Sequence, residues 1–392
     1  MGNNIFMPTI EEHLKNLCQF PHRGTTTGYE HRAGDYVKEQ LESAGLAVQT
    51  EEFRAPDSAL YRTFIFIIIC ELSANFISFF GNGASIIVAV FPFFYLFVKF
   101  YLMLPIDNLI FPTGKSRNII GIIKNDSAKA RVILTAHQDS QLGSYLFEEK
   151  WLGYHKTFTN VTALASLLTV LFTVIRTAGG EGWFLTTLQV LVMSPLLVIL
   201  FLFLKAEWTG AYVQGASDDA SGVSVILKAG ELLKANPPKN LEVWVVATGA
   251  EESGLCGIMH FLKRGAGKQL DRNNTFFINH DNLGAGKLVY LTGEVLPFIR
   301  YNREFVDLLE NASKKSDIGA KPGFWDVPTD ALAPTVRGFP VVTLFAYDDK
   351  GRTPNYHYFT DTVDNVDITI PQKALDLTLA VIRELDERQL GS

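Results

Sequence analysis

The stretch RVILTAHQDS, residues 131–140, joins a short apolar run to a cluster of metal-ligand-type side chains. Its first six residues have the length and the β-branched content of a buried strand. Two later stretches repeat the pattern: LEVWVVA (241–247) runs into TGAEE, and TFFIN (275–279) runs into HD. Ligands of α/β proteins bind at the carboxyl ends of the strands. The three stretches therefore predict a site at one edge of a sheet.

Helical and extended patterns alternate along the rest of the chain. Apolar periodicity predicts helices at 10–18, 30–44, 222–234, 254–264 and 371–389, and further strands at 46–53, 118–123 and 341–345. Such alternation is typical of the α/β class. We expect a mixed, largely parallel sheet sandwiched by helices.

Four long apolar runs interrupt this pattern, at 63–80, 84–104, 158–175 and 183–204. Each has about the 20 residues that cross a bilayer, and short polar turns join them in pairs. Buried core helices are the alternative, but four paired runs favour two transmembrane hairpins. We expect the hairpins to be insertions at 60–104 and 158–204 into one discontinuous domain, formed by 1–59, 105–157 and 205–392.

Polar residues in and around these runs carry two further predictions. Glu71 and Asn75 share one face of the first run, and we favour hydrogen bonding between helices over a functional role for this pair. The domain-side flanks are rich in Lys and Arg, whereas the far turns contain only Arg176. The positive-inside rule then predicts that the domain lies on the cytoplasmic side.

Composition excludes several classes of function. The net charge is −6, and no dense run of Lys or Arg is present, which argues against nucleic acid as a partner. The three cysteines lie far apart without CxxC spacing, so neither a disulfide framework nor a thiolate zinc site is indicated. The first residues, MGNNIFMPTI, show no cleaved targeting segment. The sequence does not indicate an oligomeric state.

The ligand-type residues contain only imidazoles and carboxylates. Besides the three strand ends, Asp218 lies in GASDDASG (215–222) and His357 in NYHYFTDT (355–362). Nitrogen and oxygen donors without thiolate suit zinc, and less specifically manganese or cobalt. Each residue alone has an ordinary alternative, such as a helix N-cap for Asp218. Five such sites in consecutive elements favour a metal centre.

In this order the motifs are HxDS, DDASG, EE before SGLCG, a strand ending in Asp, and HxxxDT. The pattern resembles the co-catalytic zinc aminopeptidases of metallopeptidase family 28, whose relatives include glutamate carboxypeptidase II and the glutaminyl cyclases. The resemblance covers roughly residues 10–55 and 116–390. It implies the zinc exopeptidase fold and two zinc ions per chain, held by His137, Asp218, Glu252, Asp281 and His357.

The resemblance also implies individual roles. Asp218 would bridge the two metals, Glu251 would be the general base, and Asp139 would orient His137. Asp361 would stabilise the loop that carries His357. A tyrosine could stabilise the oxyanion, and the candidates are Tyr347, Tyr356 and Tyr358.

The sequence departs from the family pattern at two places. Thr329-Asp330-Ala331 lacks the His that the family often has, and His280 replaces an apolar residue. Alternation along the strand points His280 away from the metals, which favours a structural role.

The predicted function is zinc-dependent removal of N-terminal residues from peptides. The second hairpin lies between His137 and Asp218, and its short connections hold the site near the bilayer. A substrate at the membrane surface is therefore expected. Cleavage of N-acyl amino acids or other lipid amides is the alternative, a non-catalytic membrane scaffold is a second, and a glutaminyl cyclase is weaker.

Overall fold

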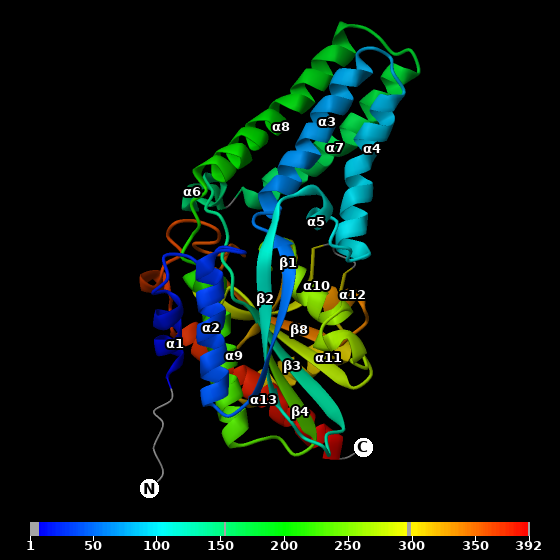
Figure 1. Cartoon of the computed structure of the whole chain (residues 1–392). Coiled ribbons are helices and arrows are strands. Elements are labelled where there is room, and N and C mark those ends of the chain that lie inside the picture. Colours follow the sequence, from blue (N-terminus) through cyan, green and yellow to red (C-terminus); the bar gives the residue numbers. More distant parts are fainter. Residues whose placement is uncertain (1–7, 153, 296–298, 391–392) are drawn as a thin grey trace. The chain divides into compact units, whose positions relative to one another are not determined.

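The computed structural model describes residues 8–152, 154–295 and 299–390, and the chain divides into two compact units (Figure 1). We call the first unit the sheet domain; it comprises Met1–Asp57, Pro112–Gln141 and Tyr212–Ser392. The second unit, the helical insertion, comprises Ser58–Phe111 and Leu142–Ala211. Residues 1–7, which begin the segment examined for a targeting signal, lie outside the described part.

The described part of the sheet domain contains one eight-stranded sheet, in the order β1-β2-β4-β3-β5-β8-β6-β7. The central strands β4, β3, β5 and β8 are parallel, whereas β1, β2 and β6 pair antiparallel with β2, β4 and β8. The strands are β1 (Ala47–Pro56), β2 (Thr113–Ile123), β3 (Ala130–His137), β4 (Leu241–Thr248), β5 (Thr275–His280), β6 (Lys287–Glu294), β7 (Lys321–Trp325) and β8 (Val341–Tyr347). The predicted mixed, largely parallel sheet is confirmed.

Strand β3 occupies the middle of the sheet because both of its faces are apolar. Val132, Ile133 and Leu134 are completely buried, as expected for a strand covered on both sides. The registers place His137 opposite Thr248 of β4, and Thr135 opposite Asn279 of β5. The three strands therefore end at nearly the same level, which brings the residues that follow them to one edge.

Helices cover both faces of the sheet. On one face α9 (Ser221–Ala235) packs on the central strands, beside α1 (Ile10–Leu17), α2 (Gly28–Ser43) and α13 (Thr369–Leu390). On the other face α10 (Cys256–Lys263) packs on β1 and β2 and contacts α12 (Leu332–Val336). Strands β6 and β7 and helices α12 and α11 (Arg303–Lys315) were not predicted from the sequence.

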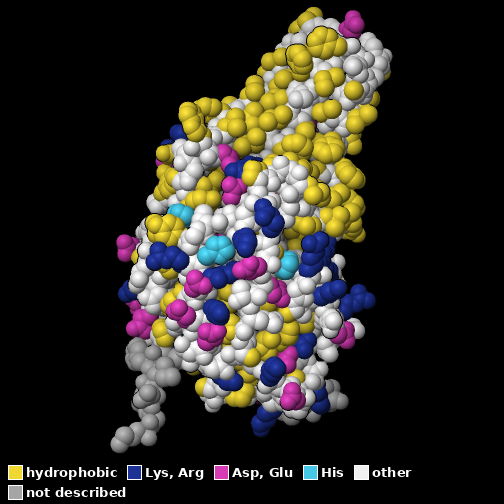
Figure 2. Space-filling view, viewed as in Figure 1, with side chains coloured by type: hydrophobic (Ala, Val, Ile, Leu, Met, Phe, Trp, Pro, Cys, Tyr) yellow, Lys and Arg dark blue, Asp and Glu magenta, His cyan; other side chains and the backbone are white. Residues whose placement is uncertain are grey.

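The helical insertion is built from α3 (Leu60–Ser78), α4 (Ala84–Leu96), α7 (His155–Thr177) and α8 (Trp183–Thr209), with the short helices α5 (Asp107–Ile110) and α6 (Glu149–Leu152). Among the described residues, α3, α8, the segment Ala84–Tyr101 and the segment Thr159–Thr177 are long and apolar enough to cross a membrane. Their outward surface is covered with hydrophobic side chains (Figure 2). Trp183 and Trp208, near opposite ends of α8, are 80% and 90% exposed. Exposed tryptophans at both ends of a span are typical of the two bilayer interfaces.

Polar side chains inside the helical insertion bind one another across helices. Asn75 donates to the Thr169 hydroxyl at 2.8 Å, and Gln189 donates to Ser78 at 3.0 Å and to Asn75 at 3.3 Å. Arg176 in turn donates to Gln189 at 2.9 Å. For Asn75 the predicted hydrogen bonding between helices is confirmed. Its partners lie on α7 and α8 of the second hairpin, rather than on the adjacent α4.

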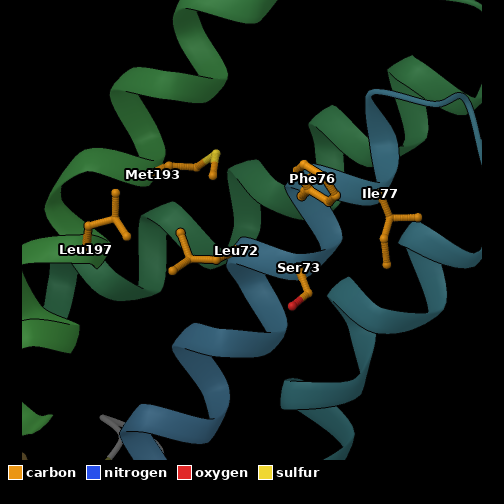
Figure 3. A pocket seen from close by; sticks show the side chains of 6 residues that line it. All are labelled: Leu72, Ser73, Phe76, Ile77, Met193 and Leu197. Atoms are coloured by element: carbon orange, nitrogen blue, oxygen red, sulfur yellow. The ribbon is translucent and has the colours of Figure 1, made fainter.

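An open apolar groove lies between α3 and α8 (Figure 3). The residues that line it are Leu72, Ser73, Phe76, Ile77, Met193 and Leu197. The first four belong to α3, and Met193 and Leu197 belong to α8. Helix α3 thus meets α8 through polar contacts at Asn75 and also lines an apolar groove beside it.

Candidate metal centre

The ends of β3, β4 and β5 bring three ligand-type side chains together. His137 is the last residue of β3, Glu252 follows β4 after a short turn, and Asp281 directly follows β5. All three are buried. Ligand atoms of His137, Glu252 and Asp218 lie within 4.8 Å of one another.

Asp218 lies in the turn η3 (Ala216–Ala220), directly before α9, and the backbone of Asp218 and Asp219 is not helical. The peptide bond between Asp218 and Asp219 is cis. Asp219 accepts hydrogen bonds from the backbone N–H of Gly222 at 2.9 Å and of His137 at 3.2 Å. Asp219 is therefore the residue that caps the start of α9, and the carboxylate of Asp218 is left to face the site.

The carboxylate of Asp218 lies between two imidazoles. Its Oδ1 is 3.0 Å from Nε2 of His137, and its Oδ2 is 3.1 Å from Nε2 of His357. Nε2 of His357 is also 3.3 Å from Oε2 of Glu252. The structure thus brings four of the five predicted metal ligands into direct contact.

Asp281, the fifth predicted ligand, interacts electrostatically with Asp218 and His137. Burial, and then the negative charge of Asp218, raises the pKa of Asp281 to about 8. The contribution of Asp218 to this shift indicates that the Asp281 carboxylate lies near the same cluster.

The chemistry of this cluster fits zinc. The donors are imidazole nitrogens and carboxylate oxygens, as in many catalytic zinc sites. Oε1 of Glu252 is buried and has no hydrogen-bond partner among the described residues. A buried carboxylate oxygen without a partner is costly unless it is neutralised, and a bound cation would do this.

A family model described as peptidase family M28 matches residues 195–382. The chain carries a peptidase family M28 domain. This finding confirms the family predicted from the five motifs, which the structure has now brought to one edge of the sheet.

Solved structures share the fold of this M28 domain. A zinc-dependent exopeptidase from Parabacteroides distasonis is 15% identical with a TM-score of 0.58, covering 96% of this chain and 99% of that one. A leucine aminopeptidase precursor from Bacteroides thetaiotaomicron is 16% identical with a TM-score of 0.59, covering 96% and 98%. A glutaminyl cyclase from the same organism has the same identity, score and coverage. The predicted zinc exopeptidase fold is confirmed.

Two curated proteins match over shorter stretches. The alkaline phosphatase isozyme conversion protein of Escherichia coli is 37% identical over 90 residues, which are 23% of this chain and 26% of that protein. Aminopeptidase YwaD of Bacillus subtilis is 40% identical over 70 residues, 18% of this chain and 15% of that protein. The matches span about a quarter or less of these relatives.

The loop of the M28 domain that carries Glu251 and Glu252 is held by side chains. Gly249 N–H donates to Asn118 at 3.1 Å, and Ala250 N–H donates to Glu30 at 3.2 Å. Glu251 N–H and Glu252 N–H donate to the two oxygens of Asp139, at 3.0 and 3.2 Å. Four consecutive N–H groups thus bind side-chain oxygens, which fixes the direction of both glutamates.

Asp139 was predicted to orient His137. Its Oδ1 lies 3.6 Å from Nδ1 of His137, and its shorter contacts are to the glutamate loop and to the Thr25 hydroxyl, at 2.7 Å. Asp139 therefore lies beside the imidazole and also supports the loop of the predicted base. Orientation of His137 stays a prediction.

Charge accumulates around Glu251. Burial raises its pKa well above the ordinary value, and the neighbouring Glu252, Asp330 and Asp281 raise it further, against an opposing effect of His137. Burial would lower the pKa of His357, but Glu252 and Asp218 raise it to about 10. At neutral pH the metal-free cluster therefore retains protons, and a metal ion that binds there must displace them.

Two further residues noted in the sequence, His280 and Tyr356, have close contacts in the structure. His280 bonds to the Thr378 hydroxyl at 2.8 Å and to the Thr135 carbonyl at 3.2 Å, and burial lowers its pKa to about 4, which is consistent with a structural role. Among the three candidate tyrosines, Tyr356 stacks on His357 with ring centroids 3.7 Å apart.

Asp361 connects two of the metal-site loops. It belongs to the loop of His357, and its carboxylate accepts from the N–H groups of Ser217 at 2.6 Å and Asp218 at 3.2 Å. It therefore also supports the loop that carries the central carboxylate, which the sequence did not predict.

Sequence reasoning missed several residues around the centre. Gln141 donates to Oε2 of Glu252 at 2.9 Å, and the completely buried Glu30 and Arg23 bind the loops behind the ligands. Gln141 could have been found, because it directly follows the HQDS motif. Arg23 lies 115 residues before Gln138, and Glu30 lies 220 residues before Ala250, so no local pattern identifies these contacts.

Proposed function

We propose that this chain is a two-zinc metallohydrolase that removes N-terminal residues from peptides near a membrane surface. The observation that carries the proposal is the position of Asp218, whose two oxygens lie 3.0 and 3.1 Å from the imidazoles of His137 and His357. A carboxylate in this position can offer one oxygen to each of two metal ions.

The remaining ligands divide between the two metal positions. His137 and Asp281 would complete one, and Glu252 and His357 the other. Zinc bound there supplies a water of lowered pKa and polarises the scissile carbonyl. Support for zinc comes from the donor set and from the M28 family match.

Glu251 is proposed as the general base. Its carboxylate would take the proton from the attacking water and pass it to the leaving amine. A base works best when its pKa lies near the operating pH, and burial raises the pKa of Glu251 in that direction. The hydrogen bond from Glu251 N–H to Asp139 holds the start of this side chain in place.

The direct test uses the full chain purified in detergent. We expect two zinc ions per chain by elemental mass spectrometry, and hydrolysis of aminoacyl-arylamides that a chelator abolishes and zinc restores. N-acetylated versions of the same arylamides are the matched control and should not be cleaved. A single zinc per chain would contradict the bridged centre, and cleavage of the acetylated substrates alone would contradict an aminopeptidase.

A second substrate class is favoured by one observation. Gln141 binds the ligand Glu252, and the next residue in the chain, Leu142, begins the helical insertion. The chain thus passes from a residue that binds a proposed ligand directly into the helical insertion, so lipid amides such as N-acyl amino acids are the alternative substrate. Release of fatty acid, without any turnover of free-amine substrates, would favour this class.

We also propose that the sheet domain lies on the cytoplasmic side, because Lys and Arg are concentrated at the domain-side flanks of the four runs. Labelling of single cysteines placed in the domain and in the turn 178–182 tests this side. A cytoplasmic domain predicts that only the turn reacts with an impermeant reagent added outside intact cells.

A further inference from the structure

Arg23 is a completely buried arginine that binds backbone carbonyls and lies in the segment before α2. Its Nε donates to the carbonyl of Gln138 at 2.9 Å. Its two terminal nitrogens donate to the carbonyls of Gln214 and Gly215, each at 2.7 Å. A single guanidinium therefore joins two chain segments that are about seventy residues apart in sequence.

These two segments are the points at which the second part of the helical insertion leaves and re-enters the sheet domain, since the insertion occupies residues 142–211. They are joined by further hydrogen bonds. Val213 N–H donates to the Gln141 carbonyl at 2.9 Å, and the Ser140 hydroxyl donates to the Val213 carbonyl at 3.0 Å. The Ser140 hydroxyl also accepts from Arg23 N–H at 3.0 Å.

The same two segments carry metal ligands. His137 directly precedes Gln138, and Asp218 follows Gly215 by three residues. Asp361 binds the N–H groups of Ser217 and Asp218, whereas Arg23 binds the carbonyls just before them. The turn that carries Asp218 is thus held through both its donors and its acceptors.

We propose that Arg23 is a positioning residue for the metal centre. By tying the two ends of the insertion together, it sets the 3.0 Å approach of Asp218 to His137. It touches neither substrate nor metal, and it acts on the ligands through the backbone on either side of them. This inference rests on the proposed zinc centre.

The geometry calls for arginine at this position. The three carbonyls lie in different directions around one planar group, which presents fixed donors at Nε and at both terminal nitrogens. A lysine ammonium keeps the charge but cannot reach all three carbonyls from one atom. Arg23→Lys therefore separates geometry from charge, and Arg23→Gln removes the charge as well.

The experiment measures zinc affinity by chelator competition, together with the thermal midpoint, on the full chain in detergent. We expect Arg23→Lys to weaken zinc binding about 10- to 100-fold, the range seen when residues behind metal ligands are changed. Arg23→Gln should weaken it further. The matched control is Arg131→Lys, at the start of β3, where the arginine pairs with Glu242 at 2.7 Å.

The outcomes separate this inference from the proposed function. Wild-type protein that binds no zinc would refute the proposed function. Wild-type protein that binds zinc, with Arg23→Lys binding it equally well at a lowered thermal midpoint, would overturn only the positioning role. If Arg23→Gln does not fold, Ser140→Ala, which removes one of the bonds between the same segments, provides the second comparison and should weaken zinc binding by a smaller factor.

Discussion

Two buried polar clusters distinguish the two units of this chain. In the helical insertion, the uncharged side chains of Asn75, Thr169 and Gln189 bind one another across helices, and the guanidinium of Arg176 donates to Gln189. In the sheet domain, imidazoles and carboxylates converge on Asp218, and burial and like charge raise the pKa of Asp281 to about 8. The first cluster is held by hydrogen bonds between its own side chains, whereas in the second the carboxylates outnumber the imidazoles and a cation would balance the charge. Charge balance therefore distinguishes packing from a functional site better than burial does.

The largest effect is expected from a substitution in the cluster of the sheet domain, and it tests whether that cluster is catalytic. Glu251→Gln should lower kcat for aminoacyl-arylamides by about 10²- to 10⁴-fold, because the variant cannot accept the proton of the attacking water. Zinc content should stay unchanged, since Glu251 is not a proposed ligand. Steady-state kinetics and elemental analysis check both, with Glu242→Gln as a control outside the site. Unchanged kcat would refute the role of Glu251.

Zinc affinity should rise with pH if the cluster in the sheet domain holds protons that zinc displaces. The pKa values of Asp281 and His357 are about 8 and about 10, so both groups are largely protonated at pH 6. Affinity should increase about tenfold per pH unit for each proton displaced. Chelator competition at pH 6, 7 and 8 measures this slope. A flat profile would mean that the cluster is already deprotonated.

Glu294 is a buried carboxyl of the sheet domain that accepts hydrogen bonds from an uncharged residue, Thr329. It therefore shows what burial does to a carboxyl outside the proposed metal site. Burial raises its pKa from 4.5 to about 8, although Thr329 donates to it twice at 2.9 Å. The unfolded chain loses this proton first as the pH rises, so the contribution of Glu294 to stability is lost between about pH 4.5 and 8.

Glu294→Gln should remove this loss, because an amide does not ionise. From pH 5 to 8 the variant should lose about 3 to 4 kcal/mol less unfolding free energy than the wild type. Denaturant unfolding at the two pH values measures the difference. If the unfolding free energy of both proteins fell equally with pH, the pH dependence would come from groups other than Glu294.

The smallest effect is expected in the helical insertion. Asn75→Leu should cost about 1 kcal/mol, the usual scale for hydrogen bonds between membrane helices, and should leave zinc content unchanged. Thermal unfolding in detergent and elemental analysis test this. Loss of zinc in this variant would show that the two clusters depend on each other, and would contradict the view that the cluster in the helical insertion serves packing alone.

Much of the fold could be predicted because buried parallel strands are continuous apolar runs. Residues 131–136, 241–247 and 275–279 all lie in observed strands. Between 282 and 340 no element was predicted, although α11 has a local signal there. Asn302 caps its N-terminus through a 3.0 Å bond from Phe305 N–H, and apolar residues recur at helical spacing. Strand β6 lies at the start of this stretch and was also missed.

The site was predictable where its residues form local motifs, and unpredictable where they act over long range. His137, Asp218 and His357 lie in short motifs, and the structure brings all three together. Arg23 binds backbone carbonyls 115 to 192 residues away. Because every residue has a backbone carbonyl, no residue type in the sequence marks these partners. The supporting residues of a metal site therefore appear only when the chain is folded.

Both parts of the helical insertion begin and end at neighbouring backbone positions of the sheet domain. Pro56 pairs with Thr113 across β1 and β2, and Gln141 binds Val213. Each part therefore replaces what could be a tight turn. In protein engineering, the apolar helical segments could be excised and each gap closed with a few residues of glycine and asparagine, which would leave the strand register of the sheet domain unchanged.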